Sequence, residues 1–288
     1  MGQKANPISL QLGTKKSWTI EFSEKKPRDV GLITEQSMQI LKFIKRYLEC
    51  QTISLQNFKL YYTENTITIF LSIFSFASKN KLNTHQNHMI KLKKKGVLIT
   101  DKDCWFLNLT NPVPHLQLAK LVASISKFTG GRKIVFKVSI ANKHLNLTSQ
   151  EKKAARRKML ILRRYKRQDF FIESFDTLFS VSRNKNFASV LLDFLKKYVK
   201  KFVRARFFLR FLRKTLSLLI KDTKYKTSGI KIKVKGRLNG ANRSKSFEIN
   251  VGRVPIHSER VDLDYVSSQT QNKNGSYGIK IWTVKISK

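Results

Sequence analysis

The sequence predicts a protein of two domains that combines helices and strands, in the α+β or α/β class. Its 288 residues are the length of about two domains. Hydrophobic residues make up 41% of the chain, so a packed core can form. Residues 230–235 alternate apolar and cationic side chains, which indicates a half-buried strand. Apolar residues three and four positions apart indicate helices in 34–49 and 191–220.

The first 33 residues are predicted to form an extended basic arm. Pro7, Gly13 and Pro27 interrupt regular structure, and the segment is rich in lysine. Such arms bury too little surface to fold alone and usually become ordered on RNA. A disordered tail is the alternative.

Residues 34–142 predict a helix, two strands, a helix and a third strand. Thr34 is the expected N-terminal cap of the first helix. A hairpin loop at 63–65 joins the two strands, and Gly130–Gly131 ends the second helix. The predicted elements are helices at 34–49 and 112–128 and strands at 53–62, 66–76 and 132–140.

The second half of the chain begins with a strongly basic stretch, residues 150–168, predicted to be a helix along RNA or a solvated linker helix. Residues 191–220 predict two amphipathic helices with a break near 203–207. Strands follow at 230–235 and 277–286, with a turn-rich stretch between them.

The net charge points to a polyanionic partner. The chain has 58 basic and 18 acidic residues, a formal charge of +40. Ordinary solubility needs a net charge of only about 2–8. A charge of +40 repels itself in a compact chain, and nucleic-acid phosphates would remove that penalty. A soluble protein with a solvated basic coat is the alternative.

Two tight turns carry arginine beside glycine, in Gly236-Arg237-Leu238-Asn239-Gly240-Ala241 and in Gly252-Arg253-Val254-Pro255-Ile256-His257. Glycine permits backbone paths closed to other residues, and the guanidinium group makes two parallel hydrogen bonds to a phosphate. These motifs, with Asp262-Leu263-Asp264-Tyr265 and Gly278-Ile279-Lys280-Ile281-Trp282, resemble the C-terminal domain of the small-subunit ribosomal protein three family. The opening, MGQKANPISLQLG, resembles the bacterial and organellar branch of that family.

The resemblance implies a degenerate type II KH-like domain followed by a C-terminal α/β domain with two helices packed on a mixed sheet. The KH glycine loop is expected at Thr110–His115, but the segment has no glycine, so RNA binding in the KH manner is not expected there. The predicted parts are the arm at 1–33, the KH-like domain at 34–142 with an insertion at 77–110, a basic helical insertion at 143–189, and the C-terminal domain at 190–288.

In function, the resemblance implies a structural constituent of the small-subunit head that binds rRNA and lines the mRNA entry channel. Its implied neighbours are small-subunit proteins ten and fourteen. The residues expected at the mRNA entry are Arg206, Arg210, Arg213 and Lys214. Those expected to bind rRNA are Gln3, Lys4, Asn6, Lys152, Arg156, Arg157, Arg163, Arg164, Arg237, Arg243, Arg253, His257 and Arg260.

The alternative from another class is a free organellar RNA-processing factor or RNA chaperone. An enzyme is not expected, since the five histidines are scattered and no metal-ligand spacing occurs. Asp262 and Asp264 are expected to form a structural ion-pair cluster with Arg253 and Arg260. We expect no cofactor, no metal, no membrane span and no stand-alone oligomer.

The expected location is the mitochondrial ribosome. The bacterial-type opening, the missing glycine loop and the lack of a recognisable import signal favour a mitochondrially encoded copy. A plastid or a bacterial cytoplasm is the alternative.

Overall fold

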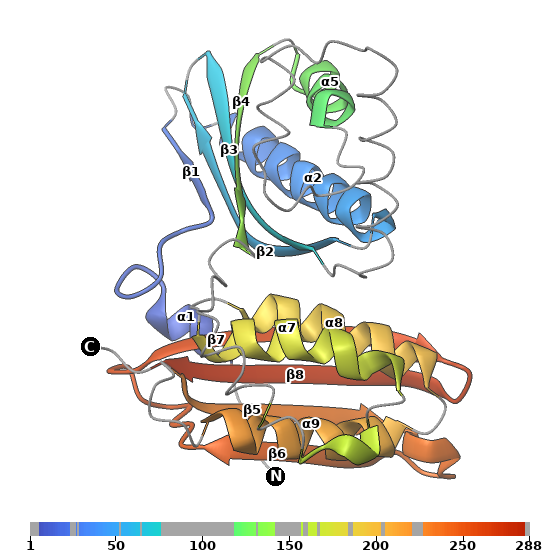
Figure 1. Ribbon diagram of the computed structural model, residues 1–288. Coiled ribbons are helices and arrows are strands. Elements are labelled where there is room, and N and C mark those ends of the chain that lie inside the picture. The colour runs from blue at the N-terminus through green and yellow to red at the C-terminus, as the bar shows by residue number, and fades with distance from the viewer. Residues whose placement is uncertain are drawn as a thin grey trace, which may run out of the picture. The chain divides into compact units, whose positions relative to one another are not determined.

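The computed structural model describes residues 6–23, 27, 29–51, 53–63, 65–75, 118–130, 132–141, 157, 161–165, 168–183, 187–202, 205–220 and 227–285. The chain forms two compact units (Figure 1). Thr19–Asn146 form the inserted unit. Met1–Trp18 and Leu147–Lys288 together form the terminal unit, which is therefore discontinuous in sequence.

The inserted unit contains a four-stranded sheet in the order β1-β2-β3-β4. The β2–β3 pair is antiparallel, whereas β1 runs parallel to β2 and β4 runs parallel to β3. Helices α2 and α5 lie on the same side of this sheet (Figure 1). The elements are β1 (Ile20–Phe22), α2 (Asp29–Cys50), β2 (Ile53–Tyr62), β3 (Thr66–Ser75), α5 (Leu118–Phe128) and β4 (Lys133–Ile140).

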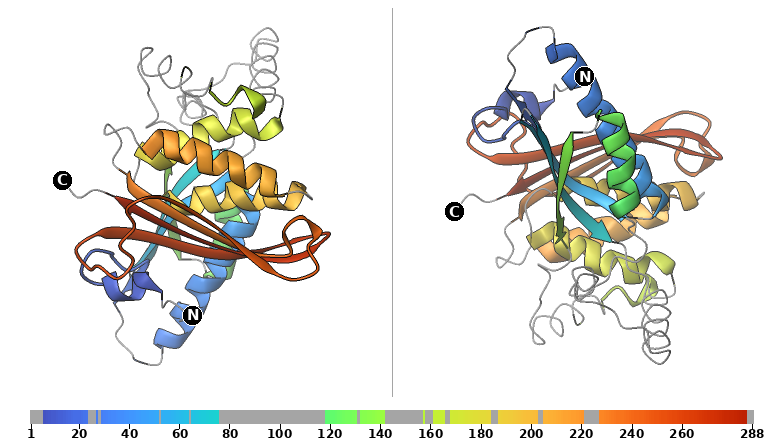
Figure 2. Two further views of the ribbon diagram at one scale, coloured as in Figure 1. Left: turned by 90° about the horizontal axis from the view of Figure 1, so that it is seen from below. Right: turned by 90° about the horizontal axis from the view of Figure 1, so that it is seen from above.

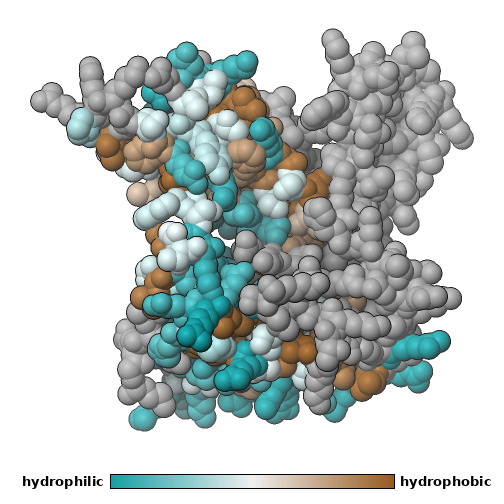
Figure 3. Space-filling model, turned by 90° about the vertical axis from the view of Figure 1, so that its left-hand side faces the viewer, coloured by the Kyte–Doolittle hydropathy of each residue, from teal (hydrophilic) through white to brown (hydrophobic). Residues whose placement is uncertain are grey.

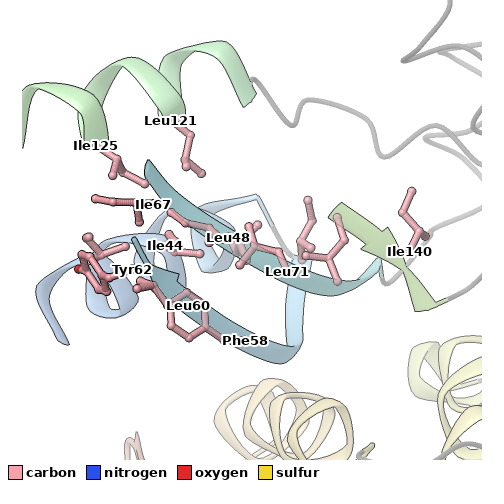
Figure 4. Packing of buried hydrophobic residues seen from close by; sticks show 14 of the residues in the cluster. Ile44, Leu48, Phe58, Leu60, Tyr62, Ile67, Leu71, Leu121, Ile125 and Ile140 are labelled. Atoms are coloured by element: carbon pink, nitrogen blue, oxygen red, sulfur yellow. The ribbon is translucent and has the colours of Figure 1, made fainter. Parts of the chain in front are cut away.

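The core of the inserted unit lies between the two helices and the sheet (Figure 4). Alternate residues of β2, such as Phe58, Leu60 and Tyr62, are buried because successive strand side chains point to opposite faces. Helix α2 contributes residues such as Ile44 and Leu48 to the same cluster. The spacing of apolar residues read from the sequence therefore reflects the side of each element that is buried.

Most predicted elements of this unit are confirmed, but the first helix begins earlier than expected. It starts at Asp29, so Thr34 lies inside it and the predicted cap is wrong. The Thr34 hydroxyl instead donates to the Gly31 carbonyl at 2.8 Å. An acidic residue at the helix N-terminus suits the helix dipole, which explains the start at Asp29. The loop at 110–115 and the insertion at 77–110 lie outside the described residues.

The terminal unit contains a second four-stranded sheet, in the order β6-β5-β8-β7. All three neighbouring pairs are antiparallel, so the prediction of a mixed sheet is wrong. The tight turn between Asn272 and Gly275 explains the pairing of β7 with β8, because two-residue loops join antiparallel neighbours. The strands are β5 (Thr227–Gly236), β6 (Lys245–Gly252), β7 (Asp262–Asn272) and β8 (Gly275–Lys285).

Three helices lie on one side of this sheet (Figure 2). They are α7 (Asp169–Arg183), α8 (Ala188–Lys201) and α9 (Ala205–Ile220). Helix α8 packs on β7 and β8, whereas α9 packs on β5 and β6, and α7 contacts both helices. The predicted break between α8 and α9 is confirmed. Residues 143–189 were expected to be a basic helical insertion, but the helix was placed at 150–168, so α7 itself was not located.

Aromatic side chains fill the space between the three helices. Phe170 of α7 is fully buried, and its ring contacts Tyr198, Phe202, Phe208 and Phe211, with centroids 4.8–6.0 Å away. Edge-to-face and tilted pairs of this kind add stability beyond the area they bury. These aromatic side chains therefore form a core that holds α7 against the two expected helices.

Two further predictions need correction. Residues 1–33 do not form a wholly extended arm, since α1 (Pro7–Gln11) is helical and β1 belongs to a sheet. The predicted helix at 150–168 is not continuous, because residues 161–162 form a turn and Arg163–Tyr165 a short 3-10 helix, η2. Helix α1 is short because Asn6 caps it and Leu12 returns to extended backbone.

Candidate nucleic-acid interface

Helix α9 separates an apolar face from a cationic one. Its inward residues, among them Phe208, Leu212 and Leu216, are buried against the rest of the unit. Arg206, Arg210, Arg213 and Lys214, the predicted mRNA-entry residues, lie four, three and one positions apart and so share one side of the helix. Arg206 is partly buried, and the other three are exposed.

The cations of α9 differ from those of α8 in their partners. On α8, Lys197 forms an ion pair with Glu173 at 2.6 Å, and Lys196 forms one with Asp193 at 3.5 Å. The sequence of α9 contains no acidic residue. Within the part of the chain that the structure describes, no carboxylate pairs with Arg210 or Arg213. Among these described residues, the charge of Arg210 and Arg213 is therefore not neutralised.

The first arginine turn, η3 (Leu238–Gly240), follows β5 directly and has a fixed shape. Gly236 lies against the Tyr277 ring, where a Cβ would come within 2.5 Å of a ring carbon, so no larger residue fits. The Tyr277 hydroxyl donates to the Arg237 carbonyl at 2.8 Å. The Arg237 side chain donates to the Ala241 carbonyl at 3.0 Å. The turn therefore holds Arg237 at the surface.

Asn239 connects this turn to helix α9. Its backbone is left-handed, with φ of 60°, which asparagine tolerates better than most residues. Its side-chain oxygen accepts a hydrogen bond from the Arg206 N–H, at 3.2 Å. That N–H lies in the first turn of α9, where donors lack partners within the helix. The predicted rRNA residue Arg237 and the predicted mRNA-entry residue Arg206 therefore lie in one structural unit, which we call the turn–helix site.

The second arginine turn lies at the opposite end of the β5–β6 pair. Gly229 and Gly252 face each other in the register. A Cβ on Gly229 would lie 2.5 Å from the Arg253 carbonyl oxygen, and one on Gly252 would overlap the Ser228 carbonyl oxygen. Gly252 also has φ of 73°. The two strands thus approach too closely for side chains, and Arg253 is exposed at the bend.

The chain after this bend packs onto the sheet through Ile256, which joins Leu263, Trp282 and Val284 in a small apolar cluster. His257 and Arg260 follow that anchor in the chain and are exposed. Gly229 and Gly236 are seven strand positions apart, roughly 24 Å. The predicted rRNA residues therefore form two groups, with Arg237 and Arg243 at one end of the sheet and Arg253, His257 and Arg260 at the other.

The described start of the chain is attached to β7. Gln11 is 3% exposed, and its side chain donates to the Val261 carbonyl at 2.7 Å and accepts from the Leu263 N–H at 3.4 Å. Asn6 accepts from the Ile8 N–H at 3.1 Å, so this predicted rRNA residue has a structural role as a cap. Residues 6–18 therefore belong to the terminal unit, although they precede the inserted unit in the sequence.

The carboxylates of β7 have partners that the sequence did not indicate. Asp264 pairs with Lys16 at 3.4 Å and also accepts from the Ala188 N–H at 3.3 Å, at the start of α8. The predicted pairing of Asp264 with Arg253 and Arg260 is therefore wrong. Cationic and N–H partners come from α8 and from the first residues of the chain, which are distant in sequence and close in the fold.

Lys285 is a buried lysine beside this pair, 3% exposed. Its ammonium group donates to the Val181 carbonyl at 2.6 Å and to the Thr227 hydroxyl at 2.7 Å. Burial lowers the pKa of Lys285 from 10.5 to about 8, and the charges of Asp264 and Asp262 oppose that shift. Because Val181 lies in the last turn of α7, Lys285 satisfies a carbonyl at that helix end.

The remaining predicted rRNA residues either lie outside the described part of the chain or are exposed at the surface. Gln3, Lys4, Lys152 and Arg156 lie outside the described residues. Arg157, Arg163, Arg164 and Arg243 are exposed. Tyr165, next to Arg164, is buried against Phe207 and Phe211, with ring centroids 4.9 and 5.1 Å away. This contact holds the arginine pair of η2 beside helix α9.

Both arginine turns and helix α9 fall in the segment for which a family is found. Residues 204–283 match the family model described as Ribosomal protein S3, C-terminal domain. The matched segment runs from the start of α9 almost to the end of β8. The likeness therefore covers the elements that form the turn–helix site and the second arginine turn.

Relatives named Small ribosomal subunit protein uS3 are similar to the chain over different lengths. The protein of Borrelia hermsii is 43% identical over 69 residues, 24% of this chain and 25% of the relative. That of Borrelia garinii subsp. bavariensis is 47% identical over 57 residues, 20% of each. That of Treponema denticola is 24% identical over 282 residues, 98% of this chain and 85% of the relative. The chain thus spans about a quarter or less of the length of the two Borrelia relatives.

The described residues hold no group of three or more histidine, cysteine or acidic side chains that could bind a metal. In the same residues, no helix is both long enough and apolar enough to cross a membrane. Three functional relationships were missed from the sequence: the Asn239 cap, the Lys16–Asp264 pair and buried Lys285. The left-handed preference of asparagine beside glycine was the only local signal for any of them.

Proposed function

We propose that this chain is a structural, RNA-binding component of the small ribosomal subunit. The match of residues 204–283 to the ribosomal S3 C-terminal domain and the similarity to uS3 proteins along 98% of the chain support it. The observation that carries it is the turn–helix site, where exposed arginines of a rigid turn and of an amphipathic helix occur together. Phosphate contacts of this kind position a protein on RNA without reading its sequence.

Within that function, we propose two RNA contacts for the terminal unit. The turn arginines at both ends of the β5–β6 pair bind rRNA in the subunit head. The exposed face of α9, with Arg210, Arg213 and Lys214, lines the mRNA entry. Its lack of acidic residues supports this assignment, since a strand of mRNA needs an unneutralised cationic surface. Small-subunit proteins ten and fourteen are the proposed neighbours.

The inserted unit is proposed to be a KH-like domain. The order of helix, two strands, helix and strand supports this, as does its sheet with one parallel and one antiparallel partner for β3. The proposed location is a mitochondrial ribosome, on the features of the sequence given above, with a plastid or a bacterial cytoplasm as alternatives. The named relatives come from bacteria.

The first experiment separates a ribosomal protein from a free processing factor. Lysate of the source cells is sedimented through sucrose at high salt, and the protein is detected across the gradient. We expect it with small subunits, because a component embedded among rRNA helices resists salt, whereas a peripheral factor is washed off. Recovery only in the light fractions would contradict the proposal.

A second experiment tests the α9 face. Arg210, Arg213 and Lys214 are changed together to Ala, and subunits carrying this variant are compared with a control in which Lys42, Lys45 and Arg46 of α2 are changed to Ala. Both variants lose three exposed helical charges. We expect both to assemble and only the α9 variant to bind mRNA more weakly. Failure of the α9 variant to assemble would assign these residues to rRNA instead.

A further inference from the structure

The sheet of the inserted unit has a second face, opposite α2 and α5. Side chains alternate along β3, so Ile67, Ile69 and Leu71 are buried toward the helices. Thr68 and Phe70 lie on the other face and are only partly buried. This second face is outside the core cluster of the unit.

The register brings aromatic and cationic side chains together on that face. Lys59 of β2, Phe70 of β3 and Lys137 of β4 are direct neighbours across the sheet. Tyr61 lies one pair further along β2, and its ring meets that of Phe70 edge to face, with centroids 5.4 Å apart at 80°. The Lys137 ammonium lies 5.0 Å from the Phe70 ring centroid. We call Lys59, Tyr61, Phe70, Lys133 and Lys137 the sheet platform.

The rest of this face is mostly polar, with Val135 as an apolar neighbour of Thr68 and Glu21 as a carboxylate paired with Tyr61. Thr68 pairs with Tyr61, and Ser139 pairs with Ser72, two residues along β3 from Phe70, so both add hydroxyl groups near the rings. Of the described residues on these four strands, Glu21 at the edge strand β1 is the only carboxylate. Figure 3 shows residues of intermediate and high hydrophilicity lying among hydrophobic ones on the side of the molecule that it presents. An apolar protein partner would need a more continuous hydrophobic surface.

We propose that the sheet platform binds single-stranded RNA. Two bases stack on Tyr61 and Phe70, and the adjoining phosphates contact Lys59, Lys133 and Lys137. Aromatic rings on an open four-stranded sheet are a known way to bind unpaired bases, and each stack is tolerant of sequence. Lys137 is exposed on a flexible stem, so its ammonium moves from the ring to a phosphate as a base arrives. The site lies outside residues 204–283 and goes beyond the proposed ribosomal function.

The test uses the purified full-length chain and a uridine oligonucleotide of about ten nucleotides, a length within the range bound by single-stranded sites. Ultraviolet crosslinking followed by mass spectrometry identifies the residues attached to uracil. We expect crosslinks at Tyr61 or Phe70. This measurement needs no substitution, so it is not affected by misfolding. Crosslinks confined to residues 147–288 would overturn the inference.

Variants separate stacking from charge. Tyr61→Leu and Phe70→Leu each remove a ring while keeping an apolar side chain, and each should weaken oligonucleotide binding on the order of tenfold. Phe43→Leu is the matched control, since Phe43 is an exposed ring on α2, on the other side of the sheet. Equal weakening by the Phe43 variant would also overturn the inference.

The lysines are tested through the salt dependence of binding. Lys59→Gln with Lys137→Gln should lower the slope of log affinity against log salt by about 1.4, since each contact to single-stranded RNA contributes about 0.7. Lys42→Gln with Lys45→Gln on α2 should leave the slope unchanged. If the platform variants bind like the wild type while the protein still sediments with small subunits, the inference fails and the ribosomal function stands.

Discussion

The backbone N–H of Arg206 donates to the side-chain oxygen of Asn239 at 3.2 Å, so a turn between two strands caps a helix that lies more than thirty residues earlier in the chain. The hydrogen bond fixes the start of α9 relative to η3. It therefore also fixes the spacing between the arginines of the helix and those of the turn. An RNA backbone would meet them as one surface.

Asn239 should tolerate glycine better than alanine. Asn239→Gly loses the cap but keeps the left-handed backbone, and should cost only a few tenths of a kcal/mol to about 1 kcal/mol. Asn239→Ala loses the cap and also strains a φ of 60°, and should cost about 2 kcal/mol. Urea unfolding of both variants measures the difference. Equal losses would mean that the backbone conformation of Asn239 does not matter.

Gly252 and Gly240 provide a matched pair for the second arginine turn. Both have positive φ, 73° and 74°, but a Cβ on Gly252 overlaps the Ser228 carbonyl, whereas one on Gly240 meets nothing within 4 Å. Gly240→Ala should therefore cost about 1 kcal/mol of unfolding free energy, from backbone strain alone. Gly252→Ala should cost more than about 3 kcal/mol, since two strand backbones must separate. A similar cost for both would show that close approach is not the constraint.

Gln11 should hold the described start of the chain to the terminal unit. Gln11→Ala removes the hydrogen bonds to Val261, just before β7, and to Leu263 of β7, and should cost about 1–3 kcal/mol because these backbone groups lose their partner. Trypsin should then cut faster after Lys15 and Lys16. The control is Gln39→Ala, which removes one exposed hydrogen bond to Glu35 on α2. Unchanged cleavage in the Gln11 variant would contradict the anchoring role.

Lys285 should make stability depend on pH in the alkaline range. Its pKa is about 8 in the fold and 10.5 as the ordinary value, so between these values the unfolded chain binds more protons than the folded one. Stability contributed by this group therefore rises with pH across that window and is lowest below it. The free energy of unfolding of wild type relative to Lys285→Met should thus increase from about pH 7 to about pH 9.5.

The comparison with Lys285→Met also removes the effect of Tyr62, whose pKa is raised by burial and which is present in both proteins. A difference that stays constant with pH would show that Lys285 remains charged in the fold up to the ordinary lysine range. The neutral amine still has N–H donors, so the loss of the bonds to Val181 and Thr227 penalises the variant throughout this pH range and does not reverse the expected trend.

Regular periodicity explains what the sequence could predict. The strand at 53–62 and the break before α9 were predicted correctly, because alternation and helical spacing follow from which side of an element is buried. The structure also agrees with the predictions that one face of α9 is cationic and that arginine lies at two tight turns. In each case the signal lies within a dozen consecutive residues.

Tertiary contacts explain what it could not. Strand β6 was read as part of a turn-rich stretch, since only pairing with β5 makes that sequence a strand. Helix α7 was missed because its residues are stabilised by aromatic partners on α8 and α9. Arginine partners were predicted for Asp264 because they are near it in the sequence, whereas its actual partner, Lys16, is 248 residues away.

The attachment of Gln11 to β7 sets the order in which the protein can be completed during synthesis. The inserted unit is continuous and can fold once its last strand has left the exit tunnel. Gln11 has to wait for a partner that is translated 250 residues later. This segment is thus translated before the inserted unit but reaches its native position after it, and a nascent chain stalled before β7 would expose it to proteases and chaperones.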